Sequence, residues 1–207
     1  MRHGESIWNA ERRVQGQLDP PLSAEGRRQA GQLARRLAGR QLAGFYTSDL
    51  ERAKETARVI GEAVGLAPEP MPGLREIYLG EWEGLRTDEL AARFPSAWKR
   101  WVREPDWDLV PGAEGAAAFE LRVGEAVAAI FERHPQGEVL VVTHGGVIQV
   151  ALHEAIGRTS RGLFVFKIQN TSISILERRH GRLTVGGVND IGHLEAAERK
   201  DAPTFRA

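Results

Sequence analysis

The chain has 207 residues, which suits a single domain, and its basic and acidic side chains balance to a formal net charge of +0, so we expect neither nucleic acid nor an anionic membrane as a partner. The absence of cysteine excludes disulfide bonds, thiol catalysis and cysteine-bound metals. No apolar run approaches the roughly 18 residues of a membrane span and no signal peptide opens the chain, so a cytoplasmic enzyme is the simplest expectation.

The chain begins with a histidine between an arginine and a glycine, Arg2-His3-Gly4. A strand that ended at His3 would contain only two earlier residues, whereas strands usually run about five or six residues. Either the chain lacks its first strand or that strand is very short. The following segment 12–21 contains glycine and proline as breakers, which predicts a loop that borders the site of His3.

Apolar periodicity and capping residues predict helices and strands that alternate along the rest of the chain. We expect helices over about 24–38, from the capping-box pattern at Ser48 to about 64, and over about 87–94, 115–134 and 147–156. We expect strands over about 42–47, 138–142, 163–168, 171–177 and 183–188.

This alternation predicts an α/β fold with three layers, α/β/α, in which a mostly parallel mixed sheet has one antiparallel edge. We expect one domain over residues 1–207, with a helical cap segment at about 85–112. The cap segment contains Trp98, Trp101 and Trp107, which either cover the site or form a satellite of the core. Ordinary burial preferences favour the core interpretation.

A second histidine, His144, follows the continuous apolar run 138–142 and precedes two glycines. Ligands of open α/β sheets bind at the carboxyl ends of the strands, so His3 and His144 meet there if their strands are neighbours. Arg52 falls in the first turn of a helix after a strand, where helix N-termini attract anions. Histidine can attack phosphorus and carry the phosphoryl group, and arginine binds phosphate oxygens bidentately. These residues therefore predict a phosphate pocket around a nucleophilic histidine.

Cleavage of a phosphate ester also needs an acid that protonates the departing alkoxide. Glu76, Glu81 and Glu83 are the candidates, and Glu76 is the one we expect to point inward because an apolar pair follows it. The other histidines do not form metal-ligand spacings, and no nucleotide-binding glycine motif occurs. We therefore expect neither a metal nor another cofactor.

Several blocks of the sequence resemble the histidine phosphatase superfamily, in its phosphoglycerate mutase-like branch, and most closely its broad-specificity phosphatases. The matching blocks are Arg2-His3-Gly4-Glu5-Ser6 with Trp8-Asn9, Gln15-Gly16 through Pro21-Leu22-Ser23, Ser48-Asp49-Leu50 with Arg52-Ala53, Leu74-Arg75-Glu76 with Trp82-Glu83-Gly84, and Thr143-His144-Gly145-Gly146. The likeness extends over nearly the whole length. It departs from the family at the start, because family members ordinarily carry several apolar residues before the Arg-His-Gly block.

The resemblance assigns a role to each block. It implies that His3 is the nucleophile that becomes phosphohistidine, and that Arg2, Arg52 and His144 hold the transferring phosphoryl group. Glu76 corresponds to the proton donor, which later assists water in hydrolysing the intermediate. The remaining family positions imply contacts with phosphate or substrate from Asn9, Gln15, Gly16 and Gly145.

The resemblance implies a metal-independent phosphomonoesterase that acts on small phosphorylated metabolites. The motif at 76–84 and the modest length favour a phosphatase, since true mutases usually have a longer cap segment. Two alternatives stay open: a cofactor-dependent phosphoglycerate mutase and a catalytically silent phosphate-binding module. Dimers are common among members of the family, so a homodimer is an expectation from the resemblance alone.

Overall fold

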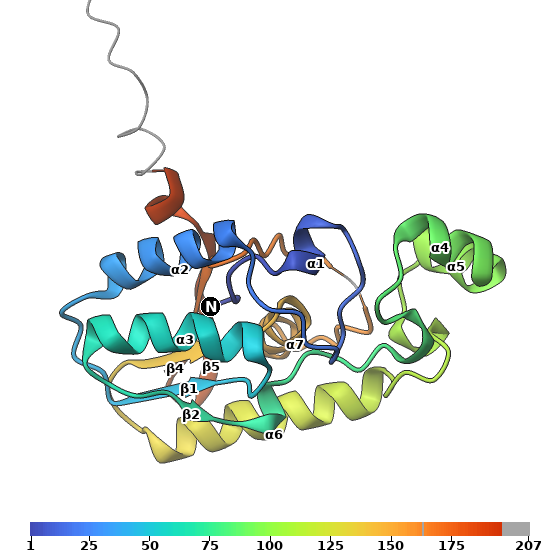
Figure 1. Ribbon diagram of the computed structural model, residues 1–207. Coiled ribbons are helices and arrows are strands. Elements are labelled where there is room, and N and C mark those ends of the chain that lie inside the picture. The colour runs from blue at the N-terminus through green and yellow to red at the C-terminus, as the bar shows by residue number, and fades with distance from the viewer. Residues whose placement is uncertain (163, 196–207) are drawn as a thin grey trace, which may run out of the picture.

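A short parallel sheet with the strand order β2-β1-β3 forms the middle layer of the protein in the computed structural model (Figure 1). The structure describes residues 1–162 and 164–195. The strands are β1 (Gly44–Thr47), β2 (Glu69–Pro70), β3 (Val139–Val142), β4 (Ile173–Arg179) and β5 (Arg182–Asp190), of which the last two form an antiparallel pair. The helices are α1 (Ile7–Ala10), α2 (Ala24–Leu37), α3 (Glu51–Val64), α4 (Thr87–Arg93), α5 (Pro95–Arg103), α6 (Ala116–Arg133) and α7 (Gly145–Ala155).

The sheet is covered by helices on both faces, as Figure 1 shows for α2 and α3 against α6. Successive strand residues point to opposite faces, so Phe45 joins the core under α2 and α3 while Tyr46 joins the core under α6 and α7. In β3, Leu140 and Val142 belong to the first core, and Val139 and Val141 pack against the second. A strand that is apolar on both faces is typical of a parallel sheet between helical layers.

Residues 1–3 lie between β3 and the start of the antiparallel pair. The Thr143 amide donates to the Met1 carbonyl at 2.9 Å, and the His3 amide donates to the Thr143 carbonyl at 2.9 Å. On the other side, the Arg2 amide donates to the Ser172 carbonyl at 3.2 Å. This parallel pairing joins the sheet to the hairpin, so the predicted α/β fold with a mostly parallel sheet and an antiparallel edge is confirmed.

The strand predicted over 163–168 is wrong for residues 164–168, and residue 163 lies outside the described residues. Side chains form hydrogen bonds with the backbone groups that would otherwise pair with a neighbouring strand. The Gln149 side chain accepts a hydrogen bond from the Phe166 amide and donates one to the Phe166 carbonyl. The Ile168 carbonyl accepts a hydrogen bond from Arg2 at 2.7 Å. The segment is apolar because it packs on α7, with Ile168 buried in the same cluster as Ile148.

The capping box predicted at Ser48 is also wrong. Helix α3 begins at Glu51, and its N-cap residue Leu50 makes no side-chain capping bond. The carboxylate of Asp19, from the loop 12–21, accepts the Glu51 amide at 2.8 and 2.7 Å instead. A distant loop therefore satisfies the first turn of α3, and Ser48 is left for another contact.

The segment predicted as a cap contains α4 and α5, which lie to one side of the sheet in Figure 1. Its aromatic residues follow the core interpretation. Trp107 is 1% exposed and packs edge-on against Phe119 with ring centroids 5.0 Å apart. Trp98 and Trp101 pack against Trp82 at 5.9 and 5.4 Å. Within residues 1–162 and 164–195, no helix is long and apolar enough to cross a membrane.

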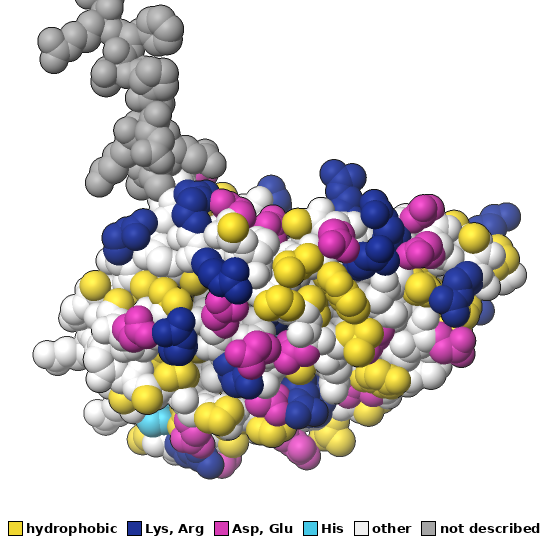
Figure 2. Space-filling model, viewed as in Figure 1, with side chains coloured by type: hydrophobic (Ala, Val, Ile, Leu, Met, Phe, Trp, Pro, Cys, Tyr) yellow, Lys and Arg dark blue, Asp and Glu magenta, His cyan; other side chains and the backbone are white. Residues whose placement is uncertain are grey.

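The face of the molecule seen in Figure 2 carries acidic and basic side chains side by side, with apolar side chains between them. Charged side chains of neighbouring elements form surface ion pairs, such as Arg27 with Glu55 at 2.6 Å, which joins α2 to α3. This face therefore has no large patch of charge of one sign, in keeping with the formal net charge of +0.

Candidate active site

Two histidines meet at the carboxyl ends of neighbouring chain segments. His3 ends the short parallel pairing with Thr143, which follows β3, and the next residue, His144, is the N-cap residue of α7. Their ring centroids are 5.1 Å apart, and the side chains are 2% and 0% exposed, respectively. The structure therefore brings together the two histidines that the sequence places at strand ends.

The hydrogen bond of His3 fixes which ring nitrogen carries the proton. Nδ1 lies 2.6 Å from the carbonyl oxygen of Gly4, which can only accept, so Nδ1 donates and Nε2 keeps a free lone pair. Burial, followed by the charges of Arg52 and Arg2, lowers the pKa of His3 well below its usual 6.5. The imidazole is therefore neutral at physiological pH, as a nucleophile must be.

Close backbone contact holds the nucleophile segment against α2. A Cβ on Gly4 would lie 2.5 Å from the carbonyl oxygen of Gly26, and a Cβ on Gly26 would lie 1.9 Å from the carbonyl oxygen of Glu5. The Gly4 amide donates to the Thr56 hydroxyl of α3 at 3.0 Å. Glycine is therefore needed at both contact positions, and the segment after His3 is anchored to two helices.

Two arginines lie beside the histidines, of which Arg52 is buried and Arg2 is half-buried. Arg2 donates from one terminal nitrogen to Ile168, and Arg52 donates to the carbonyl oxygens of Gly16 and Leu18 at 2.7 and 2.8 Å. Burial lowers the pKa of Arg52 to about 10, and the nearby charge of Glu76 partly opposes this effect, so the guanidinium stays positive at neutral pH. Both arginines bring positive charge to the two histidines, whose pKa values are lowered by burial and by these charges.

Three nitrogen atoms in this cluster have no hydrogen-bond partner among the described residues. They are the Nε atoms of Arg2 and Arg52 and the Nδ1 atom of His144, and all three are buried. Arg2 Nε lies 3.9 Å from the position that a Cβ on Gly145 would take, at the N-terminus of α7. A buried polar atom without a partner is costly, so two arginine donors and one histidine nitrogen beside a nucleophile indicate a site for an anion with several oxygen atoms.

Glu76 points into the same cluster. One carboxylate oxygen accepts the Ile77 amide at 3.0 Å, and the other accepts the Gly146 amide in the first turn of α7 at 3.1 Å. Of the other two candidates, Glu81 is exposed, and Glu83 accepts the amides of Gln17 and Leu79 at 2.7 and 3.0 Å. Glu83 therefore joins two loops, and Glu76 is the carboxylate that the fold directs to the histidines.

The structure gives each of the four residues predicted to contact phosphate or substrate a defined local setting. The side-chain oxygen of Asn9 accepts from the Ser6 amide and from Asn170 at 3.1 and 3.2 Å, which leaves the Asn9 amide nitrogen as a donor. Gln15 accepts from the Ser6 hydroxyl at 2.7 Å, and Gly16 has a positive φ of 54° next to Glu83. Gly145 is the first residue of α7.

Comparison with known proteins assigns the family. A model of the histidine phosphatase superfamily (branch 1) matches residues 1–191. The chain belongs to this superfamily. Phosphoglycerate mutase-like protein 4 of Arabidopsis thaliana is 38% identical over 199 residues, which cover 94% of this chain and 85% of that protein. The Metal-independent phosphoserine phosphatase of the same plant is 32% identical over 200 residues, covering 95% of this chain and 82% of that protein.

The solved structure of Bacillus stearothermophilus YhfR gives a TM-score of 0.86 at 35% identity, with 93% of this chain and 96% of that chain covered. The family expected from the sequence motifs is thus confirmed. The relatives of this histidine phosphatase are named as phosphatases and as phosphoglycerate mutase-like proteins, which confirms the expected enzyme class.

The structure adds residues to the histidine phosphatase site that the sequence did not reveal. Ser48 lies 2.8 Å from His144 Nε2 and thereby orients that ring. The Thr171 amide donates to the carbonyl oxygens of both Arg2 and His3 at 3.1 and 3.2 Å, and the Asn170 side chain donates to the His3 carbonyl at 3.1 Å. Thr171 adopts a positive φ of 57°, which is rare for a β-branched residue, so no local sequence pattern marks this place.

Proposed function

We propose that this histidine phosphatase is a metal-independent phosphomonoesterase that hydrolyses small phosphorylated metabolites through a phosphohistidine on His3. One observation carries the proposal: three buried nitrogens without partners, on Arg2, Arg52 and His144, surround an imidazole whose Nε2 is free. A phosphoryl group in contact with Nε2 would give each of these nitrogens an oxygen to bind. Phosphoryl transfer depends mainly on such positioning and on neutralising charge on the equatorial oxygens.

In the first step, His3 Nε2 attacks phosphorus while the bond from phosphorus to the ester oxygen breaks. Protonated Glu76 gives its proton to the departing oxygen, which leaves as an alcohol. The positive charges of Arg2 and Arg52 compensate the charge on the phosphoryl oxygens, the role that a metal ion has in other phosphoryl-transfer enzymes. The Asn9 amide nitrogen and the backbone at Gly145 add donors to the same oxygens.

In the second step, water attacks the phosphohistidine and the bond between nitrogen and phosphorus breaks. Ionised Glu76 accepts a proton from this water, so the carboxyl group is ready to donate in the next cycle. His3 returns to the neutral tautomer with the proton on Nδ1, which the Gly4 carbonyl stabilises. Inorganic phosphate then leaves, and the atoms of one ester and one water are accounted for.

The test is a paired assay of purified protein in the presence of EDTA. Phosphate release is measured from a panel of monoesters that includes phosphoserine, 3-phosphoglycerate and p-nitrophenyl phosphate, and 2-phosphoglycerate formation is measured beside it. We expect phosphate release without isomerisation, and an acid-labile phosphoenzyme that is trapped in the wild type and absent from His3→Ala. Activity that EDTA abolishes would overturn the metal-independent mechanism.

A phosphoglycerate mutase is the second candidate, because the relative with 38% identity is named mutase-like. Both reactions use the same phosphohistidine, and they differ in whether water or a second hydroxyl receives the phosphate. Isomerisation of 3-phosphoglycerate that is faster than phosphate release would favour the mutase. A protein that releases no phosphate and traps no phosphoenzyme would support a silent phosphate-binding module instead.

A further inference from the structure

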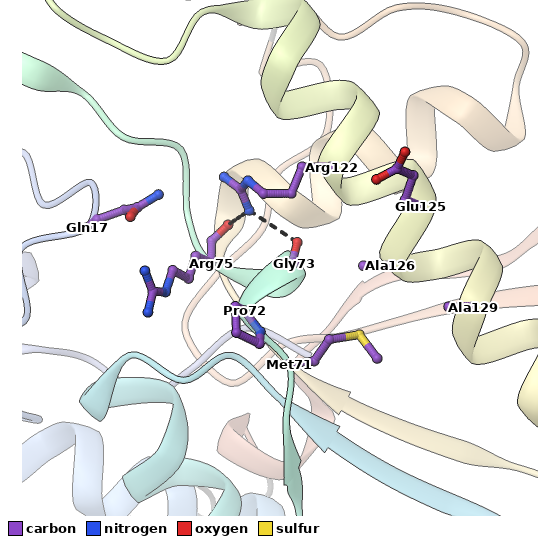
Figure 3. A pocket seen from close by; sticks show the side chains of 9 residues that line it. All are labelled: Gln17, Met71, Pro72, Gly73, Arg75, Arg122, Glu125, Ala126 and Ala129. Atoms are coloured by element: carbon purple, nitrogen blue, oxygen red, sulfur yellow. Dashed lines mark hydrogen bonds between the residues drawn. The ribbon is translucent and has the colours of Figure 1, made fainter.

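Glu76 is placed differently from the other members of the site. It lies in an irregular segment between two short 3-10 helices, Pro72–Leu74 and Gly80–Trp82, so neither a strand nor a regular helix fixes its backbone. An open cavity of about 500 Å3 borders this segment, with Gln17, Arg75 and Arg122 in its lining (Figure 3). Leu74 and Ile77 pack into the core on one side of this segment, and on the side of the cavity the backbone is held by individual hydrogen bonds.

One side chain supplies most of these bonds. Arg122, on α6, donates from one terminal nitrogen to the carbonyl oxygens of Gly73 and Arg75 at 3.1 and 2.9 Å, as Figure 3 shows. Its other terminal nitrogen donates to the carbonyl oxygen of Glu76 at 3.3 Å. From the opposite loop, the Gln17 side chain donates to the same Glu76 carbonyl at 3.1 Å. A single guanidinium thus binds the main chain on both sides of the Glu76 Cα.

Arg122 is itself held in place. Its guanidinium forms an ion pair with Glu114 at 2.6 Å and lies over the Phe119 ring at 5.1 Å. The same Glu114 oxygen accepts the Tyr78 amide at 2.8 Å. The Glu114–Arg122 pair therefore binds the segment from residue 73 to residue 78. An arginine is suited to this task, because its planar fork offers several donors in fixed directions and a lysine offers only one point of charge.

We infer that Arg122 is a positioning residue that holds the Glu76 carboxyl group at the ester oxygen of the substrate. The inference rests on the proposed function, in which Glu76 donates a proton to the leaving group. Besides Glu114 and the Phe119 ring, the partners of Arg122 among the described residues are the backbone carbonyls of Gly73, Arg75 and Glu76, so its effect on the reaction passes through Glu76. A displacement of about 1 Å in a catalytic group can lower a rate by about 100-fold.

The test uses the dependence of the rate on the leaving group. An alkyl monoester releases a strongly basic alkoxide that needs a proton, whereas p-nitrophenyl phosphate releases a weakly basic phenolate that does not. We expect Arg122→Gln to lower kcat/KM about 30-fold for the alkyl monoester that the wild type hydrolyses fastest, and less than about threefold for p-nitrophenyl phosphate. A loss of general structure would lower both values alike. The ratio kcat/KM is used because it reports formation of the phosphoenzyme and not the shared hydrolysis step.

The matched control is Arg133→Gln on the same helix. Arg133 forms an exposed ion pair with Glu69 at 2.8 Å, and no hydrogen bond is recorded from it to the described segment 73–78. We expect both substrates to keep their wild-type rates in this variant. Arg122→Lys keeps the charge but loses the fork, and we expect a loss with the same selectivity that is intermediate between wild type and Arg122→Gln. If Arg122→Gln does not fold, Arg122→Lys provides the comparison.

Glu76→Gln separates the inference from the proposed function. We expect this variant to lose about 10²–10⁴-fold with the alkyl monoester and far less with p-nitrophenyl phosphate. If Glu76→Gln shows no such selectivity, the assignment of the proton donor is wrong. If Glu76→Gln is selective while the Arg122 variants lose both activities equally, or lose neither, the positioning role of Arg122 is overturned and the proposed function stands.

Discussion

The two halves of the site are built in different ways. His3 lies at the end of a parallel backbone pairing with β3, and the segment after it is pressed against α2 and anchored to α3. Glu76 lies in an irregular segment that is held by side chains from α6 and from the loop 12–21. The position of the nucleophile thus follows from the sheet, whereas the position of the carboxyl group follows from long-range hydrogen bonds.

This difference predicts different responses to mutation. A substitution on the nucleophile side lowers the rate for every ester, because all substrates share the same phosphoryl group. Damage on the Glu76 side affects esters according to their leaving groups. A set of variants that is measured with the same two substrates can therefore map each residue to one half of the site.

The largest effect is expected from His3→Ala, which removes the nucleophile. Both p-nitrophenyl phosphate and the alkyl monoester should lose at least ~10³-fold in kcat, since the covalent route is closed. The measurement is phosphate release, with circular dichroism as the control for folding. Equal rates in the variant and the wild type would show that another group attacks phosphorus.

Arg52→Lys should have the next largest effect. A lysine keeps a positive charge but cannot bind the Gly16 and Leu18 carbonyl oxygens while it also presents a second donor to phosphate. We expect kcat/KM to fall about 100-fold for both substrates alike, comparable with the loss of one oxyanion donor. A loss restricted to the alkyl monoester would place Arg52 on the Glu76 side and contradict the division.

The nucleophile side should also make the folded protein sensitive to acid. Burial and the charge of Arg52 hold the pKa values of His3 and His144 well below 6.5, and the unfolded chain returns them to about 6.5. Below pH 6.5 the unfolded state therefore binds protons that the folded state does not. The contribution of the two histidines to the free energy of unfolding is complete above that pH and decreases as the solution is acidified.

Each histidine can lower the free energy of unfolding by at most about 1.4 kcal/mol per pH unit. Denaturant unfolding at pH 7, 6 and 5 measures it. His144→Asn should make the decrease shallower, because one of the buried groups with a lowered pKa is removed. A free energy of unfolding that stays constant over this range would contradict the buried neutral state of both rings.

The smallest effect is expected from Ser48→Ala. The Ser48 hydroxyl accepts the Leu50 amide at 3.3 Å and lies 2.8 Å from His144 Nε2, so its loss frees the ring to rotate. We expect kcat/KM to fall about fivefold for both substrates, a typical result for one neutral hydrogen bond. Ser48→Thr, which keeps the hydroxyl, should restore most of the rate. Loss in the threonine variant equal to that in the alanine variant would show a packing effect instead.

The sequence was informative where local patterns control structure. Strand ends and the glycines after them located His3 and His144, and the helix start located Arg52, because these positions follow from regular elements. The same reasoning failed at 164–168, where an apolar run packs on α7 but gives its backbone groups to the Gln149 and Arg2 side chains. Apolar composition indicates that a segment is buried, but it does not indicate which partners form hydrogen bonds with the backbone of that segment.

Arg122 and Asn170 could not be found in this way. Arg122 is one of 24 arginines in the chain, and its carbonyl partners are 46 to 49 residues away, so no local pattern marks it. Asn170 reaches the His3 carbonyl across 167 residues of sequence. Ser48 was interpreted as a helix cap, because serine in that setting usually is one, and only the contact with His144 shows its other use.

The loop 12–21 is tied to its surroundings at four consecutive positions. Arg52 holds the carbonyl oxygens of Gly16 and Leu18, the Glu83 carboxylate holds the Gln17 amide, and Asp19 caps α3. A loop anchored in this way is held in one position and is not a mobile lid. We therefore expect that slow movement of this loop does not limit the rate of turnover.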